Sequence, residues 1–355
     1  LQTLFEYQSM MAELLGVDVV NSSMYDMATG LAEAVLMAAR VNKKRSKFLV
    51  PDTINPVHWH VINTFAEPAG ITIEQVGHDQ KSMLLDLADL KSKLDSQVAG
   101  VYIENPSYLG FIEPQVDEIN HVVHDAGSLL VVGVDVLSLG ILRPPGNYGA
   151  DIVVGEGQCL GSTVSFGGPY LGVFGCKDDM KIIRQLPGRL VGMTRTSNEP
   201  YERGFVLTLV PREQHIRREK ATSNICSNQA LIAVTAAVYT STLGPEGFRH
   251  LGEVIAYRSH YAAKQLNKIS GVTAPAFGAS FWKEFVMRFE GDVSARMVHE
   301  SLLKRDLHGG KILTEDYPEL GESMLLCVTE LNSKTAIDEL VEVVRDVVTN
   351  GGGTR

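Results

Sequence analysis

Apolar runs alternate with amphipathic stretches along roughly the first 205 residues of the chain. The predicted strands are residues 48–50, 71–75, 101–103, 129–134, 152–154 and 171–174. Helical patterns lie between them, at residues 25–40, 57–65, 84–94, 116–124 and 178–186. Continuous Val, Ile and Leu runs that alternate with helices are typical of a mostly parallel sheet covered on both faces. The pattern therefore predicts an α/β fold with right-handed crossovers.

The pattern changes after this region. Residues 188–224 are rich in Arg, Thr and Gly and have little periodicity, so we predict loop and surface there. Helical patterning returns at residues 227–240 and 246–269, and a smaller α/β unit follows. Its predicted elements are a strand at 284–289, a helix at 293–305, a strand at 324–328 and a helix at 335–348. We expect a large domain at 1–226, then a helical connection and a small C-terminal α/β domain at 227–355, with a flexible tail at 351–355.

Composition and charge narrow the class of protein. The 355 residues are 45% hydrophobic and 21% charged, which is ordinary for a globular protein. The net charge of −10 argues against a general nucleic-acid binder, because neutralising phosphates requires a basic surface. The densest basic run, residues 40–45, follows a helical pattern, and we interpret it as a solvated helix end.

The cysteines bear on the cellular compartment, and the first residues bear on whether the natural chain starts earlier. Cys159, Cys176, Cys226 and Cys327 form no CxxC pair, so neither a metal site nor a disulfide framework is predicted. Reduced cysteines favour a cytoplasmic, soluble protein, and no run is long enough to span a membrane. The chain starts without Met, inside an amphipathic pattern, and we expect that a natural N-terminal segment is missing.

One candidate site lies at the start of a predicted helix. Ser22, Ser23 and Thr29 surround this start. Free amides and hydroxyls at a helix N-terminus form a natural anion site. Capping of the helix alone is the alternative interpretation, because Ser and Asn are common caps.

A second candidate residue, Asp135, ends a buried strand. Ligands of open α/β sheets bind at the carboxyl ends of the strands. A carboxylate there could pair with the ring nitrogen of pyridoxal phosphate (PLP) and keep it protonated. A capping or loop aspartate is the alternative.

The third candidate feature is a Gly-rich turn after the next strand. In PLP enzymes of the aspartate-aminotransferase type (fold type I), the Schiff-base lysine lies on this turn, a couple of dozen residues after the aspartate. Here the interval is 159 − 135 = 24, and the position holds Cys159. No lysine occurs between Leu129 and Cys176. Because a Schiff base needs a primary amine, the turn predicts no covalent PLP anchor; Lys177 and Lys181 follow in a pattern typical of a surface helix.

A dense polar stretch, residues 212–229, precedes the next helix. It is either a solvated linker or a contact surface whose arginines and amides bind a carboxylate, a phosphate or a partner subunit. Apolar Ile225 and a predicted helix cap at Ser227 indicate that at least its end is ordered.

Together these stretches resemble the N-terminal half of the glycine cleavage system P protein (glycine decarboxylase). The resemblance runs from Leu1 to about Val348. The stretches that carry it are residues 1–8, 21–26, 104–110 (Glu-Asn-Pro-Ser-Tyr-Leu-Gly), 166–172 (Phe-Gly-Gly-Pro-Tyr-Leu-Gly) and, most specifically, 217–226 (Arg-Arg-Glu-Lys-Ala-Thr-Ser-Asn-Ile-Cys).

The resemblance implies a non-catalytic subunit 1 (alpha) of glycine dehydrogenase (decarboxylating). In this family only the second half, or subunit 2, carries the PLP lysine, so the chain alone would be inactive. With subunit 2 it would decarboxylate glycine and transfer the aminomethyl group to the lipoyl arm of the H protein. The family suggests a heterotetramer, or a homodimer when the chain is isolated.

The resemblance also assigns roles to residues. Ser22, Ser23, Thr29 and Asp135 would be a vestigial cofactor pocket without a covalently bound cofactor. The candidates for the subunit interface or substrate mouth are Asn105, Arg217, Arg218, Lys220, Thr222, Ser223 and Asn224. Two alternatives stay open: an independent PLP enzyme that uses Lys177, Lys220 or another lysine, and a pure interaction protein.

Overall fold

The computed structural model describes residues 1–43, 45–226 and 228–349. The chain forms two compact units, one of residues 1–77, 85–105 and 114–248, the other of residues 78–84, 106–113 and 249–355. The predicted domain boundary at 226/227 differs from this division, which falls inside the long helix α8 (Ala230–Leu266). The prediction followed the change of sequence pattern near the end of the polar stretch, residues 212–229. The contacts divide the chain later, because α8 contributes residues to both units.

A seven-stranded sheet forms the centre of the first unit, in the order β1-β7-β6-β5-β4-β2-β3. Strands β2 to β6 run parallel to one another, whereas β7 is antiparallel to both of its neighbours, β6 and β1, which confirms the mostly parallel prediction. The strands are β1 (Val19–Val20), β2 (Lys47–Pro51), β3 (Thr72–Val76), β4 (Val98–Glu104), β5 (Leu129–Asp135), β6 (Ile152–Glu156) and β7 (Gly172–Cys176).

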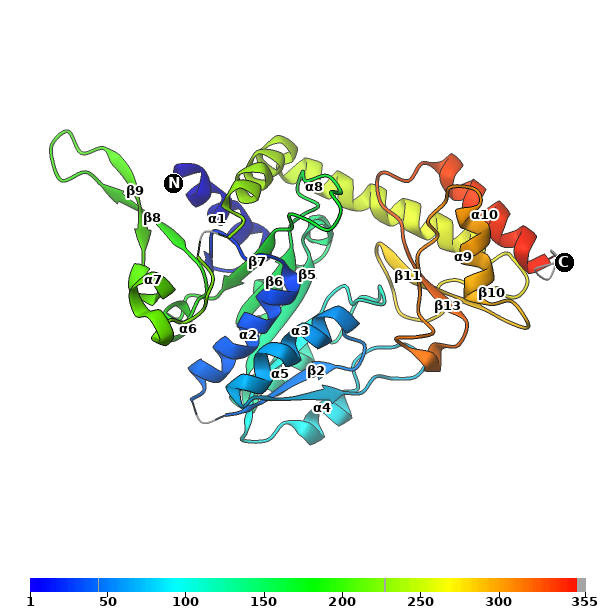
Figure 1. Cartoon of the computed structure of the whole chain (residues 1–355), viewed down its shortest axis with the longest axis horizontal. Coiled ribbons are helices and arrows are strands. Elements are labelled where there is room, and N and C mark those ends of the chain that lie inside the picture. Colours follow the sequence, from blue (N-terminus) through cyan, green and yellow to red (C-terminus); the bar gives the residue numbers. More distant parts are fainter. Residues whose placement is uncertain (44, 227, 350–355) are drawn as a thin grey trace. The chain divides into compact units, whose positions relative to one another are not determined.

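Helices flank this sheet (Figure 1). They are α1 (Gln2–Leu15), α2 (Met27–Val41), α3 (Pro56–Ala66), α4 (Leu87–Lys93), α5 (Val116–Asp125) and the short α6 (Met180–Ile183), with 3-10 turns η1 (Glu67–Ala69), η2 (Val136–Gly140) and η3 (Pro145–Tyr148). Helix α2 lies against β4 to β7. Its apolar residues recur at the spacing of one helix face, Leu31, Ala34, Val35 and Ala38, and all are buried.

The segment predicted as loop, residues 188–224, is partly regular, so that prediction was wrong. It contains an antiparallel pair, β8 (Leu190–Arg195) and β9 (Arg203–Thr208), that projects from the first unit (Figure 1). Burial decreases from Leu190 to Arg195 along β8. Because the pair bonds mainly to itself, its sequence lacks the long apolar runs of the central strands. Beyond it lie η4 (Val210–Arg212), α7 (Gln214–Arg217) and η5 (Arg218–Lys220).

Helix α8 is interrupted at Gly244, whose φ of 60° and ψ of 178° are not helical. Pro245 then begins the second segment, a position that proline favours because its missing N–H would be unbonded anyway. The two separate helical patterns predicted around this point are therefore confirmed. The predicted cap at Ser227 and the predicted flexible tail lie outside the described residues.

The second unit contains an antiparallel sheet in the order β10-β11-β13-β12. Its strands and helices are β10 (Val272–Thr273), β11 (Glu284–Phe289), β12 (Lys311–Ile312), β13 (Ser323–Cys327), α9 (Ala295–Leu303) and α10 (Lys334–Thr349), with the turn η6 (Pro318–Leu320). The predicted elements are all present, and the two-residue strands β10 and β12 were missed. In the described part of the chain, no helix has the length and apolarity needed to cross a membrane.

Candidate functional site

Three acidic residues end neighbouring strands at the carboxyl edge of the parallel sheet. Asp135 of β5 lies beside Glu156 of β6, and Glu104 of β4 lies beside Gly133 of β5. Ligands of open α/β sheets bind at this edge. Of the three, sequence reasoning singled out Asp135 alone, because strand neighbours become visible only in the sheet.

The start of α2 also lies at this edge and is occupied by carboxylates of the chain itself. Asp26 caps the helix, accepting a hydrogen bond from the Thr29 amide at 2.8 Å. The amide of Met27, the first residue of the helix, donates to Glu156 Oε2 at 3.2 Å. Two of the amides that a bound anion would use are therefore bonded to acidic side chains.

The hydroxyls of the predicted anion site are also engaged. The Ser22 hydroxyl donates to the carbonyl oxygen of Arg189 at 3.1 Å, and the Ser23 hydroxyl donates to Asn228 Oδ1 at 2.7 Å. The Thr29 hydroxyl donates to the Asp26 carbonyl oxygen at 3.2 Å. These bonds tie neighbouring segments together, which favours the capping interpretation over an open anion site.

Asp135 lies where the sequence predicted it, at the end of β5. Its Oδ1 accepts a hydrogen bond from the Leu137 amide at 2.9 Å and so caps η2. The Ser138 hydroxyl donates to the Asp135 carbonyl oxygen, which closes the same turn. The aspartate thus has a local structural role that does not depend on a cofactor.

Glu156 joins three segments at this edge. Besides the Met27 amide, its carboxylate accepts the amides of Gln158 and Leu171, each at 2.9 Å. Burial raises the pKa of Glu156; the three amide bonds oppose this increase, and the charge of Asp26 adds to it. Through its carboxylate, Glu156 fastens the Gly-rich turn to the start of α2 and to the residue before β7.

Cys159 lies on the Gly-rich turn after β6 and is exposed. Its Sγ is 3.8 Å from the carbonyl oxygen of Glu156. The structure therefore places an exposed thiol on the turn between β6 and β7.

The residues at this edge do not fit PLP. A PLP phosphate needs a helix start with available donors, and here Asp26 and Glu156 bond to the amides and would repel a phosphate dianion. The covalent anchor is also missing, because Cys159 has no amine. This edge of the sheet thus lacks a phosphate site as well as the lysine.

Lys177, one alternative anchor, lies at the opposite edge of the sheet. It follows β7, which runs antiparallel to β6, and its Nζ forms an ion pair with Asp151, the residue before β6. His124 Nε2 is 2.8 Å from the same carboxylate. Burial alone would raise the pKa of Asp151, but hydrogen bonds from His124, Lys177 and the Leu130 amide hold it below its usual value.

Comparisons with known proteins identify the family. A family model described as "Glycine cleavage system P-protein" matches residues 1–344. The chain is 50% identical over 349 residues to a protein of Staphylothermus marinus named "Probable glycine dehydrogenase (decarboxylating) subunit 1", covering 98% of this chain and 74% of that protein. The chain belongs to the glycine cleavage system P-protein family. A relative from Thermococcus onnurineus with the same name is 49% identical, over 98% of this chain and 76% of its own.

Solved structures agree with this P-protein assignment. A crystal structure of glycine decarboxylase (P-protein) in inhibitor-bound form is 37% identical with a TM-score of 0.88, over 98% of this chain and 76% of that one. A sphingosine-1-phosphate lyase of Burkholderia pseudomallei (13% identical, TM-score 0.72, 98% of this chain and 76% of its own) shares the fold alone. So does a NifS-like protein (10% identical, TM-score 0.71, 98% and 88%). The fold is fold type I of the PLP-dependent enzymes, as predicted.

The polar stretch, residues 212–229, contains most of the predicted interface residues. Arg217, Arg218, Lys220 and Asn224 are exposed, whereas Thr222 and Ser223 are half-buried. Asn105 lies apart from them along the chain, directly after β4, where its amide donates to the Gly133 carbonyl oxygen at 2.9 Å. The predicted interface residues are thus divided between the carboxyl edge of the sheet and the surface of the polar stretch.

The end of the polar stretch is ordered, as Ile225 indicated. Ile225 is buried in the core of the first unit. Asn228 Nδ2 donates to the Ser23 carbonyl oxygen at 2.6 Å, in addition to the bond that its Oδ1 accepts from the Ser23 hydroxyl. Two features found separately in the sequence, residues 21–23 and residues 224–229, are therefore in contact.

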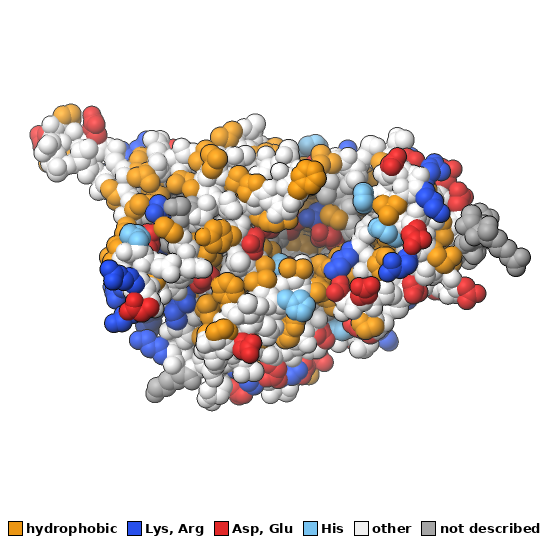
Figure 2. Space-filling model, in the orientation of Figure 1, with side chains coloured by type: hydrophobic (Ala, Val, Ile, Leu, Met, Phe, Trp, Pro, Cys, Tyr) orange, Lys and Arg blue, Asp and Glu red, His pale blue; other side chains and the backbone are white. Residues whose placement is uncertain are grey.

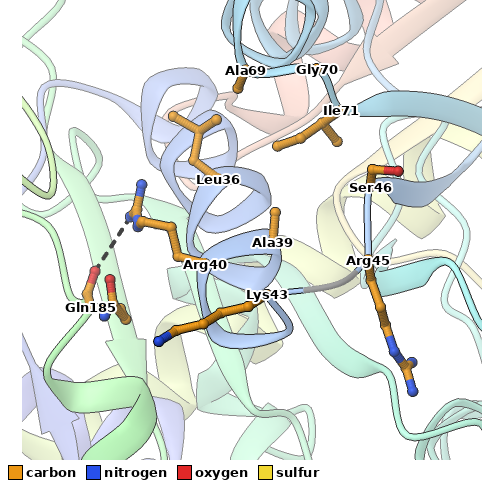
Figure 3. Close-up of a pocket in the computed structure, with 10 residues that line it drawn as sticks. All are labelled: Leu36, Ala39, Arg40, Lys43, Arg45, Ser46, Ala69, Gly70, Ile71 and Gln185. Atoms are coloured by element: carbon orange, nitrogen blue, oxygen red, sulfur yellow. Dashed lines mark hydrogen bonds between the residues drawn. The ribbon is translucent and has the colours of Figure 1, made fainter.

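A separate depression of about 830 Å³ lies near the amino ends of β2 and β3, away from the candidate site (Figure 3). Arg40 and Lys43 extend toward Gln185, whereas Arg45 points away. Arg40 Nη2 lies 3.8 Å from Glu33 Oε2, and Arg45 donates hydrogen bonds to the carbonyl oxygens of Val98 and Ala126. The basic run lies at the predicted helix end, but both of its described arginines are bonded within the chain.

Proposed function

We propose that this chain is the lysine-lacking subunit of glycine dehydrogenase (decarboxylating). In this proposal a second subunit holds PLP, and the two together decarboxylate glycine and transfer the aminomethyl group to the lipoyl arm of the H protein. This chain supplies structure around the active site of its partner and binds no PLP of its own. The family assignment supports the overall reaction, and the candidate site supports the division of labour between the subunits.

One observation carries the proposal: the start of α2 is bonded to Asp26 and Glu156, and the Gly-rich turn next to it presents Cys159. Replacing a lysine alone would leave an anion site behind. Here the amides of Met27 and Thr29, the hydroxyls of Ser22 and Ser23 and the carboxylate of Asp135 have bonding partners within the chain. The simplest explanation of these internal bonds is a chain that keeps the fold of its family and is stable without the cofactor.

The position of the candidate lysines weighs against an independent PLP enzyme. Lys177 is paired with buried Asp151 at the opposite edge of the sheet. Lys181 in α6 and Lys220 in η5 are exposed. An internal Schiff base needs an amine that lies against the cofactor, whereas Lys181 and Lys220 lie on the surface.

Exposed apolar side chains support a partner subunit. Val164 and Phe166, in the loop after the Gly-rich turn, are more than 90% exposed, and Leu231 and Val238 on α8 are 78% and 61% exposed. Leu231 and Val238 are two turns apart, so they share one helix face. Figure 2, which shows the side of the molecule seen in Figure 1, has hydrophobic side chains gathered at several places on the surface of the first unit. Apolar surface of this kind is typical of a protein interface.

We assign the polar contacts of the interface or the substrate mouth to the residues that the sequence singled out. Arg217, Arg218 and Lys220 are exposed donors, and arginine suits bidentate contact with a carboxylate. The remaining candidates are Asn105, Thr222, Ser223 and Asn224. Together with the exposed apolar side chains, these polar residues would give the subunit interface an apolar core and a polar rim.

We also propose a cytoplasmic location. The four cysteines form no disulfide with one another in the described part of the chain, and Cys159 and Cys327 are exposed. Exposed thiols persist in a reducing compartment, whereas oxidising compartments favour their pairing.

The test compares the purified chain with the reconstituted enzyme. We expect the chain alone, incubated with PLP, to show no visible absorbance band that borohydride can fix. Adding the lysine-bearing subunit should give exchange of labelled bicarbonate with the carboxyl group of glycine, and omission of either subunit should abolish it. Pyridoxyl-lysine in a peptide of this chain would overturn the proposal and support an independent PLP enzyme.

A further inference from the structure

A cluster of three metal-ligating side chains lies outside the site described above. Glu213, directly before α7, His215, within α7, and Cys226, at the end of the polar stretch, come together. No motif in the sequence indicates this cluster, because the cysteine has no neighbouring cysteine and a stretch of other residues separates it from the histidine. The fold of residues 213–226 back on itself creates it.

The three ligand atoms are spaced as in a tetrahedral metal site. His215 Nδ1 is 3.5 Å and Cys226 Sγ is 3.7 Å from the same atom, Glu213 Oε2, and all three atoms lie within 4.8 Å of one another. Bonds of about 2.0–2.3 Å to zinc in tetrahedral geometry separate two ligand atoms by roughly 3.3–3.7 Å. Two of the three separations already match, so only a small movement of the histidine ring is required.

The surroundings also suit a metal. Glu213 is only 4% exposed, and a buried carboxylate needs nearby positive charge. Arg189 supplies part of it, with Nε 3.4 Å from Glu213 Oε2 and Nη2 3.4 Å from Cys226 Sγ. An outer residue that donates to two ligand atoms holds them in place for a metal. His215 is about half exposed, so an ion can enter from solvent.

We propose that Glu213, His215 and Cys226 bind Zn²⁺, with water completing the fourth position. A carboxylate oxygen, an imidazole nitrogen and a thiolate form a mixed set that suits zinc better than the hard cations Mg²⁺ and Ca²⁺. On binding, the Cys226 thiol loses its proton to solvent and becomes the thiolate ligand. The metal fastens the two ends of the segment 213–226 to each other.

The test titrates Zn²⁺ into the full chain after removal of metal, and maps the alkylation of each cysteine by iodoacetamide. We expect uptake of one equivalent and at least tenfold slower alkylation of Cys226, with Cys159 and Cys327 unchanged, because these two exposed thiols lie elsewhere. Co²⁺ in place of Zn²⁺ should give a thiolate-to-metal charge-transfer band in the near ultraviolet.

Two variants locate the site. His215→Ala changes an exposed side chain and should leave the fold intact, while weakening zinc binding at least tenfold; Cys226→Ser should abolish the cobalt band. His308→Ala, at an exposed histidine of the other unit, is the matched control and should bind as the unmodified chain does. Absence of stoichiometric uptake, or binding and a cobalt band unchanged in both variants, would overturn the proposal.

Discussion

At the scale of single residues, Glu156 contributes as much as Cys159 to the mismatch between the candidate site and PLP. Its carboxylate bonds to the amides of Met27, Gln158 and Leu171. An acidic side chain so placed occupies the helix start that an anionic cofactor would need. The mismatch with PLP therefore involves several residues, and in the proposed function restoring one of them should be insufficient for cofactor binding.

This distribution predicts the outcome of restoring the lysine. Cys159→Lys should not give PLP binding to this chain, because the amides at the start of α2 stay bonded to Asp26 and Glu156. The measurement is the visible absorbance after incubation with PLP, followed by borohydride reduction and peptide mapping. Pyridoxyl-lysine at position 159 in this single variant would contradict the prediction.

Glu33, buried on α2, should make stability depend on pH. Burial raises the pKa of Glu33 to about 7, although Arg40 opposes the change. The folded state thus holds a proton that the unfolded state releases near pH 4.5. The free energy of unfolding, relative to the Glu33→Gln variant, should therefore fall as pH rises from about 4.5 to about 7, by up to about 3 kcal/mol, and level off above.

Urea unfolding of both proteins at several pH values checks this prediction. The glutamine variant keeps the shape of the side chain but removes the titration, so it serves as the reference. Two stability curves that run parallel across this pH range would show that Glu33 titrates normally in the folded chain.

At the scale of elements, the break in α8 depends on one backbone conformation. Gly244 combines a φ of 60° with a ψ of 178°, a region that is essentially restricted to glycine. A Cβ placed there would meet nothing within 4 Å, so any cost of substitution arises from backbone strain and not from crowding.

Gly244→Ala should accordingly destabilise the chain by about 1–3 kcal/mol. Thermal or urea unfolding measures the change. Gly278→Ala is the matched control, because a Cβ at Gly278 also meets nothing within 4 Å and the glycine does not have a positive φ. Equal stability of the two variants would mean that the helix break tolerates an ordinary residue.

The projecting β8–β9 pair illustrates how an element can lack a strong sequence signal. Its strands bond to each other and become exposed toward the tip, and their buried residues are Leu190 and Val191 at the start of β8. Short, half-exposed strands carry neither a long apolar run nor a clean alternation. By contrast, β4 to β6 are almost entirely buried and were predicted correctly.

At the scale of the whole molecule, the exposed apolar surface of the first unit should matter for assembly and not for folding. Phe166→Ser and Leu231→Ser replace side chains that are 109% and 78% exposed, so the stability of the isolated chain should stay within about 0.5 kcal/mol. Because such residues can dominate an interface, we expect association with the lysine-bearing subunit to weaken by about tenfold or more in the double variant.

Analytical ultracentrifugation or titration of one subunit with the other measures this association. Leu331→Ser removes a side chain that is 84% exposed in the second unit, and it controls for a general effect of surface hydrophobicity. Equal affinity of the Phe166/Leu231 double variant and the unmodified chain would place the interface elsewhere.

The sequence by itself determined the alternation of strands and helices, the resemblance to the P-protein family and the missing lysine. These are properties of local periodicity and of residue identity at a given position. Buried strands such as β5 are visible in the sequence as apolar runs, and the interval from Asp135 to Cys159 can be counted along the chain.

Only the tertiary structure decided which side chains meet. It brought Glu156 to the start of α2, placed Lys177 at the opposite edge of the sheet, and gathered Glu213, His215 and Cys226 into one cluster. The physical reason is that crossovers, strand direction and loop paths set such contacts, and none of these leaves a periodic signal near the residues concerned.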